Sequence, residues 1–335
     1  MNGQPITEQA PAAPALRLGT RRSALAMAQS GMVAREVTRL TGRAVELVEI
    51  TTYGDTSREA LAQIGGTGVF VSALRDALLE GRIDFAVHSL KDLPTAAPEG
   101  LVLAAVPERE DVRDALVAHE GLALAELVEK LAGAGRAARI GTGSPRRMAQ
   151  LNAWAAARGV ALETVAIRGN VDTRIGYVTK GELDAVVLAT AGLNRLGRSA
   201  EISEHLDPEL MIPAPGQGAL AIECTSANTD LAAALAALDH APTRAEVAAE
   251  RALLAALEAG CSAPVAGLAT WVRPNELRLE GVVGTTDGAT LLKMSANGPI
   301  VLDETAEQQA AALGRALAAR LLDAGAAALM GERAR

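Results

Sequence analysis

Short β-type runs alternate with amphipathic helical stretches along the first 238 residues of the chain. The helical stretches include residues 23–40, with Ser23 as a plausible N-cap, and residues 70–80, closed by Gly81. This alternation predicts an α/β fold in which the ends of strands face the starts of helices. The predicted strands are residues 16–20, 45–50, 83–88, 101–106, 139–142, 161–167, 185–189 and 219–224.

A weak internal repeat divides this region into two similar lobes. Residues 16–20 resemble residues 138–142, and residues 80–84 resemble residues 180–184. Chance matches in a chain rich in alanine and glycine would give similar pairs, so the repeat alone leaves both explanations open. We expect a tail without fixed structure at 1–15, a first lobe at 16–108 plus 219–238, and a second lobe at 113–212.

The pattern changes after Pro242 to a long helix (243–259), three β-type runs (265–272, 277–283, 291–295) and a terminal helix from Glu304. This order predicts a separate small α+β domain at 242–330. Cys261 falls in a Gly- and Pro-flanked turn of this domain. A thiol there is well placed for presentation to a neighbouring cleft, although a lone cysteine is more often a small buried apolar residue.

Charge and composition exclude several classes of function. The net charge is −8, with 32 basic and 40 acidic residues, which argues against nucleic-acid binding. No segment has the roughly 18 apolar residues needed to span a bilayer, and the N-terminus does not resemble a secretory signal, so we expect a cytoplasmic protein. The four histidines are scattered and the two cysteines lack ligand spacing, so no metal site is predicted.

Two basic motifs stand where a strand meets a helix. The first contains Arg21 and Ser23, and the second contains Ser144, Arg146 and Arg147. Backbone N–H groups, hydroxyls and guanidinium groups at a helix start form an anion site. Arg168 and Arg174, around Gly169, add two guanidinium groups beyond the strand that ends at Ile167. A solvated surface explains any one of these arginines, but it explains the whole set poorly.

Lys91 and Asp92 follow the apolar run 83–87, so they lie at the carboxyl end of a strand. A carboxylate there can act as a general acid or stabilise a cation that develops in a substrate. An aspartate that caps a turn ahead of Pro94 is the alternative from the residues alone. His88 is equally compatible with packing and with catalysis.

Eight motifs, taken in order, resemble the porphobilinogen deaminase family over about residues 16–330. They are GTRRSALA (19–26), IGGTGVF (64–70), AVHSLKDLP (86–94), REDVRDA (109–115), GTGSPRR (141–147), IRGNVDTR (167–174), PAPGQGA (213–219) and GCSAPV (260–265).

The resemblance implies two lobes like those of type II periplasmic binding proteins, and a small C-terminal α+β domain. It also implies a transferase (hydroxymethylbilane synthase) that joins four porphobilinogen units head to tail and then releases linear hydroxymethylbilane by hydrolysis. The primer would be a dipyrromethane cofactor bound through a thioether to Cys261, and the chain would be a monomer.

The resemblance assigns roles to individual residues. Asp92 matches the catalytic aspartate of the family. The residues matched to cofactor binding are Cys261, Lys91, Asp92, Ser144, Arg146, Arg147, Gly169 and Arg174. The residues matched to substrate binding are Arg21, Ser23, Phe70, Arg168, Arg174, Arg195 and Gln217.

One departure concerns the segment 64–70, where many family members carry lysines and this chain has Gln63 and Thr67. The rival interpretation is a non-catalytic bilobal protein that binds a dicarboxylate. That interpretation accounts for lobes and arginines but gives no reason for the third domain or for Cys261.

Overall fold

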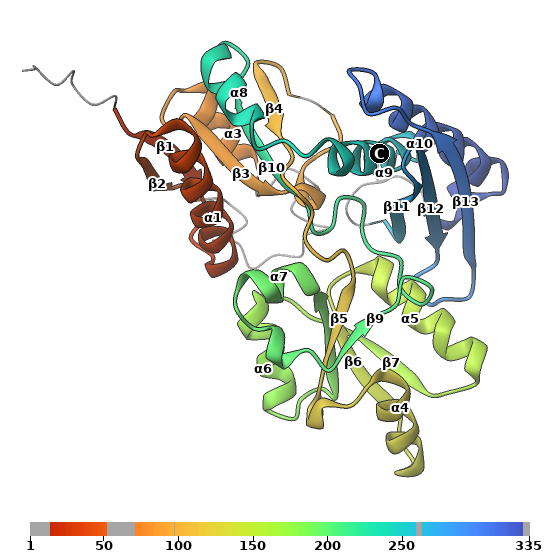
Figure 1. Cartoon of the computed structure of the whole chain (residues 1–335). Coiled ribbons are helices and arrows are strands. Elements are labelled where there is room, and N and C mark those ends of the chain that lie inside the picture. The colour runs from red at the N-terminus through yellow and green to blue at the C-terminus, as the bar shows by residue number, and fades with distance from the viewer. Residues whose placement is uncertain (1–13, 52–70, 97, 259–262, 331–335) are drawn as a thin grey trace, which may run out of the picture.

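The computed structural model describes residues 14–51, 71–96, 98–258 and 263–330. These residues form two five-stranded sheets and one three-stranded sheet. Figure 1 shows the first sheet at the upper left, the second below it and the third at the right. Phe70, Cys261, Gln63 and Thr67 lie outside the described residues.

The first lobe is built on a sheet of order β2-β1-β3-β10-β4. Helices α1 and α8 pack on one apolar cluster of this sheet, and α3 packs on another. Ser23 is the N-cap of α1 and its Oγ accepts a hydrogen bond from the Ala26 N–H at 3.3 Å, as predicted. The elements are β1 (Leu16–Thr20), α1 (Ala24–Thr41), β2 (Val45–Glu49), α3 (Ser72–Leu79), β3 (Phe85–Ser89), the 3₁₀ turn η1 (Leu90–Asp92), β4 (Leu101–Ala105), β10 (Leu220–Thr225) and α8 (Thr229–Ala236).

The second lobe has a sheet of matching order, β7-β6-β8-β5-β9. Helices α4 and α5 contribute to one apolar cluster and α6 to another. The elements are β5 (Asp114–Ala118), η2 (His119–Gly121), α4 (Leu124–Gly133), β6 (Ala138–Thr142), α5 (Pro145–Arg158), β7 (Leu162–Ala166), α6 (Val171–Thr179), β8 (Ala185–Ala189), α7 (Thr190–Arg195), η3 (Ser199–Glu201) and β9 (Glu204–Leu206). The sequence patterns missed β5 and β9.

The internal repeat has a structural counterpart in the two lobes. In the first lobe the Asp84 carboxylate accepts a hydrogen bond from the backbone N–H of Arg17 at 2.7 Å. In the second, Asp184 accepts from the backbone N–H of Arg139 at 2.8 Å. The strands β1 and β3, like β6 and β8, are parallel neighbours. Equivalent aspartates, Asp84 and Asp184, therefore bind the equivalent strand, β1 or β6, in each lobe.

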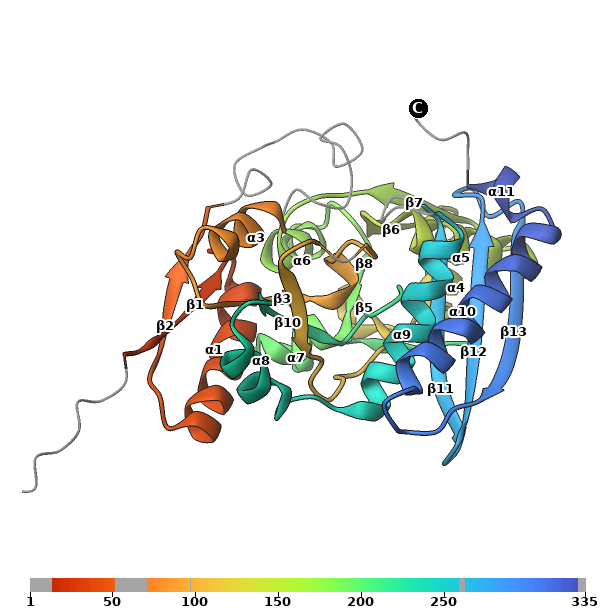
Figure 2. The same cartoon turned by 90° about the horizontal axis from the view of Figure 1, so that it is seen from above.

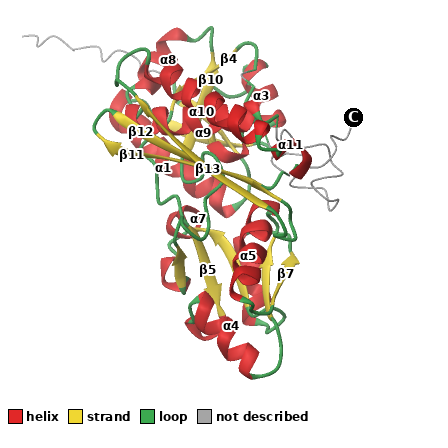
Figure 3. Cartoon of the chain, turned by 90° about the vertical axis from the view of Figure 1, so that its right-hand side faces the viewer, coloured by secondary structure: helices red, strands yellow, loops and turns green. Residues whose placement is uncertain are grey.

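The third unit places helices α9 and α10 against a three-stranded antiparallel sheet (Figure 3). The two helices approach closely at Gly314, where a Cβ atom would lie 2.3 Å from the carbonyl oxygen of Ala249. Glycine is therefore needed at this crossing. The elements are α9 (Ala241–Ala256), β11 (Val265–Arg273), β12 (Glu276–Gly284), β13 (Leu291–Pro299), α10 (Ala306–Asp323) and α11 (Ala326–Leu329).

Two connections join the lobes, one between β4 and β5 and the other between β9 and β10. Because each lobe takes one antiparallel strand from across a connection, β10 pairs with β3 and β4 while β5 pairs with β8 and β9. Figure 2 shows these segments running between the lobes and beside α9. The two lobes have the same strand order and are joined by two crossings, which makes a bilobal α/β fold with a third, α+β unit.

A single buried carboxylate fastens both connections to the third unit. Glu250 on α9 is fully buried and binds both Nη atoms of Arg109 in the first connection, at 2.8 and 2.9 Å. It also accepts hydrogen bonds from the backbone N–H of Gly216 in the second connection at 2.7 Å and of Ala269 on β11 at 2.8 Å.

Within the described ranges, no helix is both long enough and apolar enough to cross a membrane.

Candidate functional site

Both lobes, the second connection and the third unit meet at a cavity of about 200 Å³. Because every part of the described fold contributes to its wall, the cavity is sensitive to how those parts are arranged. The residues that line it are Lys91, Asp92, Gly143, Ser144, Arg146, Arg147, Arg174, Ala214, Pro215, Gln217, Leu254, Ala263 and Val265.

Lys91 and Asp92 enter the cavity from the first lobe on η1, directly after β3. Leu90 anchors this turn, because its side chain is fully buried and its N–H donates to the carbonyl of Ala219 at 3.0 Å. Burial lowers the pKa of the Lys91 ammonium to about 8, while the neighbouring Asp92 carboxylate acts in the opposite direction. The Asp92 side chain itself remains open to solvent.

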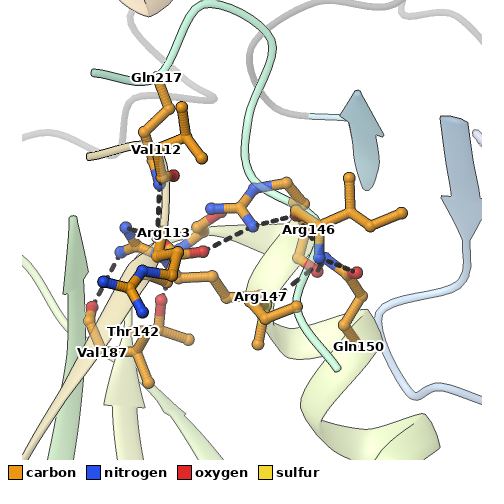
Figure 4. A network of polar contacts seen from close by, with 12 residues as sticks. Val112, Arg113, Thr142, Arg146, Arg147, Gln150, Val187 and Gln217 are labelled. Atoms are coloured by element: carbon orange, nitrogen blue, oxygen red, sulfur yellow. Dashed lines mark hydrogen bonds and ion pairs between the residues drawn. The ribbon is translucent and has the colours of Figure 1, made fainter. Parts of the chain in front are cut away.

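Arg146 and Arg147 occupy the first turn of α5, behind Pro145. Their exposed fractions are only 4% and 5%, and both guanidinium groups pair with the fully buried carboxylate of Asp114 at 2.8 Å. Arg146 also donates to the carbonyl of Ile212 at 2.6 Å, and Arg147 to that of Val187 at 2.8 Å. Figure 4 shows these contacts converging between the strands, the helix start and the second connection.

Arg174 reaches the cavity from α6, whose N-cap is Asn170. Its Nε donates to the carbonyl oxygen of Gly169 at 2.8 Å. Burial lowers the pKa of Arg174, and so does the charge of Arg147, whereas the Asp92 carboxylate raises it. The site thus places the Asp92 carboxylate and the Arg174 guanidinium within electrostatic reach of each other.

Gln217 comes from the second connection and is buried. Its Nε2 donates to the carboxylate of Asp114 at 2.9 Å and to the carbonyl of Val112 at 2.8 Å. Its Oε1, like the Nε of Arg146, is a buried polar atom without a hydrogen-bond partner. Both residues line the cavity.

The predicted site residues divide into three groups. Lys91, Asp92, Ser144, Arg146, Arg147, Arg174 and Gln217 line the cavity. Gly169 lies beside it through its contact with Arg174, while Arg21, Ser23, Arg168 and Arg195 are not in its lining. Phe70 and Cys261 fall outside the described residues.

Arg195 lines a different cavity, of about 440 Å³, between α1 and α7. Its Nη2 donates to the carbonyl of Gly218 at 2.6 Å, which ties it to the second connection. Ser23 is engaged as the N-cap of α1, and Arg168 is exposed at the start of the α6 region. Cys224, the other thiol, is buried in the apolar cluster of the first lobe, and burial raises its pKa.

The charge balance favours an anionic ligand. Four cations (Lys91, Arg146, Arg147 and Arg174) face two carboxylates (Asp92 on the wall and Asp114 behind it), so the sum is 4 − 2 = +2. Guanidinium groups pair well with carboxylates in a two-point geometry. In the described part of the chain, no cluster of His, Cys, Asp or Glu has the arrangement of a metal site.

Sequence reasoning missed the two buried carboxylates that organise this region, Asp114 and Glu250. Asp114 stands in the motif REDVRDA, but the strand that follows it was not predicted. Glu250 lies in an alanine-rich helix, where the pattern gives a charged residue no special meaning. A charged residue at a position that helical periodicity assigns to the core was the available signal.

Comparison with known proteins decides the family. Residues 16–233 match the family model "Porphobilinogen deaminase, dipyromethane cofactor binding domain", and residues 244–323 match "Porphobilinogen deaminase, C-terminal domain". The chain belongs to the porphobilinogen deaminase family. It is therefore a transferase, a hydroxymethylbilane synthase, and its cofactor is dipyrromethane.

Curated relatives support this membership over nearly the whole chain. "Porphobilinogen deaminase 1" of Streptomyces avermitilis is 67% identical and the match covers 95% of this chain and 98% of the relative. "Porphobilinogen deaminase 1" of Streptomyces coelicolor is 66% identical, covering 96% and 98%. "Porphobilinogen deaminase" of Thermobifida fusca is 54% identical, covering 92% and 94%.

Among solved structures, an arginine-specific periplasmic binding protein of Salmonella typhimurium is similar with a TM-score of 0.37 and 14% identity. The match covers 68% of this chain and 92% of that protein.

The residues of the cavity fit the family's cofactor. Dipyrromethane has two pyrrole rings that carry acetate and propionate arms, and the wall offers guanidinium groups, a net positive charge and an unpartnered Arg146 Nε. The unpartnered Gln217 Oε1 suits an N–H donor, such as a pyrrole nitrogen. The bilobal dicarboxylate-binding interpretation is not favoured by these matches.

Proposed function

We propose that this chain carries out the deaminase reaction at the cavity between its lobes, with Asp92 as the catalytic residue and Cys261 as the covalent attachment point of the cofactor. The observation that carries the proposal is the convergence of Asp92, Arg174 and the paired Arg146 and Arg147 on one cavity. When bound, the cofactor supplies a nucleophilic pyrrole carbon to which successive substrate units are joined.

Arg146, Arg147 and Arg174 bind the acid arms of the cofactor and of the growing chain. They project from helix starts on the second lobe, so their charge adds to that of the helix termini. Because Asp114 and backbone carbonyls already hold Arg146 and Arg147, little side-chain entropy is lost when a ligand binds. Ser144 is part of the same wall, and Gly169 lies beside it, where its carbonyl accepts a hydrogen bond from Arg174.

Asp92 stabilises the positive charge that develops on pyrrole nitrogen when ammonia leaves the aminomethyl group of the substrate. Its carboxylate lies in the cavity lining and interacts electrostatically with Arg174. The same carboxylate can accept a proton from the ring that is attacked and return it in a later step. Lys91, with a pKa of about 8, adds a positive charge at the same turn below that pH.

Arg21, Ser23, Arg168, Arg195, Gln217 and Phe70 are proposed to hold the incoming porphobilinogen. Gln217 belongs to the second connection and Arg195 is bonded to it through the Gly218 carbonyl, so substrate binding would be sensitive to the placement of the lobes. We also propose that the chain is divided into domains at 16–108 plus 219–238, at 113–212 and at 242–330. A cytoplasmic monomer without nucleic-acid or membrane partners completes the proposal.

The decisive experiment is intact-protein mass spectrometry on the purified chain beside the Cys261→Ser variant. We expect an adduct of two pyrrole units on the wild type and none on the variant, with a positive acid-aldehyde test for free-α pyrroles on the wild type alone. An unmodified wild type that does not consume porphobilinogen would contradict the proposal and favour a bilobal binding protein.

Asp92→Asn tests the catalytic assignment separately. The variant replaces an exposed side chain, so we expect its thermal unfolding to match that of the wild type. Its kcat should fall at least about 100-fold, the usual contribution of a positioned acid–base group. Wild-type turnover in this variant would remove Asp92 from the mechanism without affecting the assignment of Cys261.

A further inference from the structure

We propose that Asp114, which lies behind the cavity wall, is a positioning residue that holds Arg146, Arg147 and Gln217 in the orientation that receives acidic pyrroles. The inference rests on the proposed function, because it concerns the same cavity, and it names how that cavity is kept ready for its ligand. Asp114 itself is not in the cavity lining.

The first step is the placement of the carboxylate between two like charges. Arg146 and Arg147 are neighbours in sequence and both are buried, so their guanidinium groups repel each other at low dielectric. The Oδ2 atom of Asp114 pairs with Nη1 of Arg146 at 2.8 Å. Its Oδ1 atom accepts from Nε and Nη2 of Arg147 at 3.1 and 2.8 Å. One carboxylate thus divides its two oxygens between two cations.

The same carboxylate fixes which way the Gln217 amide faces. Nε2 of Gln217 donates both to Oδ1 of Asp114 and to the carbonyl of Val112, at 2.9 and 2.8 Å. A flipped amide would set its oxygen against these two acceptors, which is unfavourable. The Oε1 atom is therefore held away from Asp114, and it remains without a partner on a residue that lines the cavity.

These contacts fix the orientation of the polar side chains of the wall before a ligand binds. Arg146 is left with a free Nε, Gln217 with a free Oε1, and Arg147 is anchored to the carbonyl of Val187. Donors for carboxylate arms and one acceptor for an N–H group match a ligand that has both, as an acidic pyrrole does. Burial would raise the pKa of Asp114, but Arg146 and Arg147 hold it far below its ordinary range, so the charge persists through the working pH range.

Asp114 also connects the wall to the lobe crossing. It is the first residue of β5, directly after the first connection, whereas Gln217 belongs to the second connection. Figure 4 shows Gln217 above and Val187 and Thr142 below the same cluster. A shift of the second connection therefore acts on the cluster through the Gln217 amide and through the Ile212 carbonyl that binds Arg146.

The test compares three holoenzyme variants: Asp114→Asn, Gln217→Met and the double variant. Asp184→Asn is the matched control, because Asp184 is an ion-paired aspartate of the same lobe that binds Arg136 and the Arg139 backbone at the opposite strand end. The readouts are the fraction of purified chain that carries the pyrrole adduct, by intact mass, and kcat and KM of the adduct-bearing fraction. Thermal unfolding of every variant separates lost stability from lost positioning.

We expect Asp114→Asn to carry less adduct than the wild type and to raise KM by about 10- to 100-fold, the range for a lost hydrogen bond to a charged group. Asp184→Asn should show wild-type loading and KM even where its unfolding temperature falls. In the double variant the KM effects of the two single changes should not multiply, because Asp114 acts partly through Gln217. Wild-type loading and KM in Asp114→Asn, or fully multiplicative effects, would overturn the inference.

If Asp114→Asn does not fold, Asp114→Glu replaces it, since it retains the charge and moves it by one methylene group. The inference then predicts a raised KM with the charge retained, and wild-type KM and loading would refute it. Absence of the adduct from the wild-type chain would instead refute the proposed function, so the two failures are distinguishable.

Discussion

Replacing Glu250 by glutamine should destabilise the whole molecule, although Glu250 is outside the cavity. Its carboxylate binds Arg109 through both oxygens and accepts two backbone N–H groups, from Gly216 and Ala269. These four bonds come from both lobe connections and from the third unit. Glu250→Gln has nearly the same size, so it changes charge and hydrogen bonding without opening a void.

The magnitude follows from what is left unpaired. Arg109 is 5% exposed at its side chain, so its charge remains buried after the substitution. Breaking a buried ion pair from one side costs about 3 to 5 kcal/mol. Arg109 retains the Gln217 carbonyl at 2.8 Å, but the new amide NH₂ must face a backbone donor that the carboxylate accepted from. We therefore expect a loss of about 3 to 5 kcal/mol in the free energy of unfolding.

Thermal and urea unfolding at pH 8 measure this loss, and Glu246→Gln is the control. Glu246 lies one turn earlier on α9 and approaches the same Arg109 at 3.6 Å, but it is partly exposed. We expect Glu246→Gln not to lower the free energy of unfolding at this pH, because burial disfavours the ionised form of Glu246. Equal effects of the two substitutions, or a loss below about 1 kcal/mol for Glu250→Gln, would refute the argument that Glu250 joins the three parts.

Three further predictions concern pH and backbone geometry. Burial raises the pKa of Glu246 from 4.5 to about 7, so the folded chain binds more protons than the unfolded chain between these pH values. The free energy of unfolding, measured with urea, should therefore fall as pH rises from 4.5 to 7. Glu246→Gln should remove this pH dependence. Burial alone would raise the pKa of Glu223, but His88 and Arg75 hold it at about 2. The free energy of unfolding should therefore fall as pH drops from 4.5 toward 2. Glu223→Gln should lower stability at pH 7 and reduce this loss of stability in acid. Gly218→Ala should cost at least about 2 kcal/mol in thermal unfolding, because φ is +88° and the new Cβ would lie 2.5 Å from a backbone carbonyl oxygen.

Local patterns predicted the α/β framework and the lobe repeat because both depend on short stretches of chain. The eight strands assigned from the first 238 residues all appear, since each is a compact apolar run between turn signals. Ser23 and Gly81 were predicted for the same reason, because caps act on their own helix. β5 was missed because it begins with a charged residue, Asp114, and follows a charged segment. β9 was missed because it is only three residues long and starts with a glutamate.

The candidate site was predicted in its cationic part and missed in its anionic part. Arg146 and Arg147 stand out because two adjacent arginines at a helix start have an evident use. Asp114 becomes informative only when β5 is placed between β8 and β9, which brings it to the carboxyl end of β8 beside the arginines. The pairing of β5 with β8 joins residues that are about 70 positions apart in the sequence, such as Asp114 and Ala189, so no local pattern encodes it. The carboxylate that pairs with these buried arginines is therefore identified only once the order of the strands in the sheet is known.

Three consecutive residues of the second connection are bonded to the third unit, to the second lobe and to the first connection. The N–H of Gly216 binds Glu250 of the third unit, the side chain of Gln217 binds Asp114 of the second lobe, and the carbonyl of Gly218 accepts from Arg195 and from the N–H of Glu110. The two glycines have positive φ values, +75° and +88°, so the chain can turn sharply enough to reverse direction between these partners. A movement of the second lobe relative to the third unit would strain these bonds, and because Gln217 lines the cavity, we expect that movement to change the cavity wall.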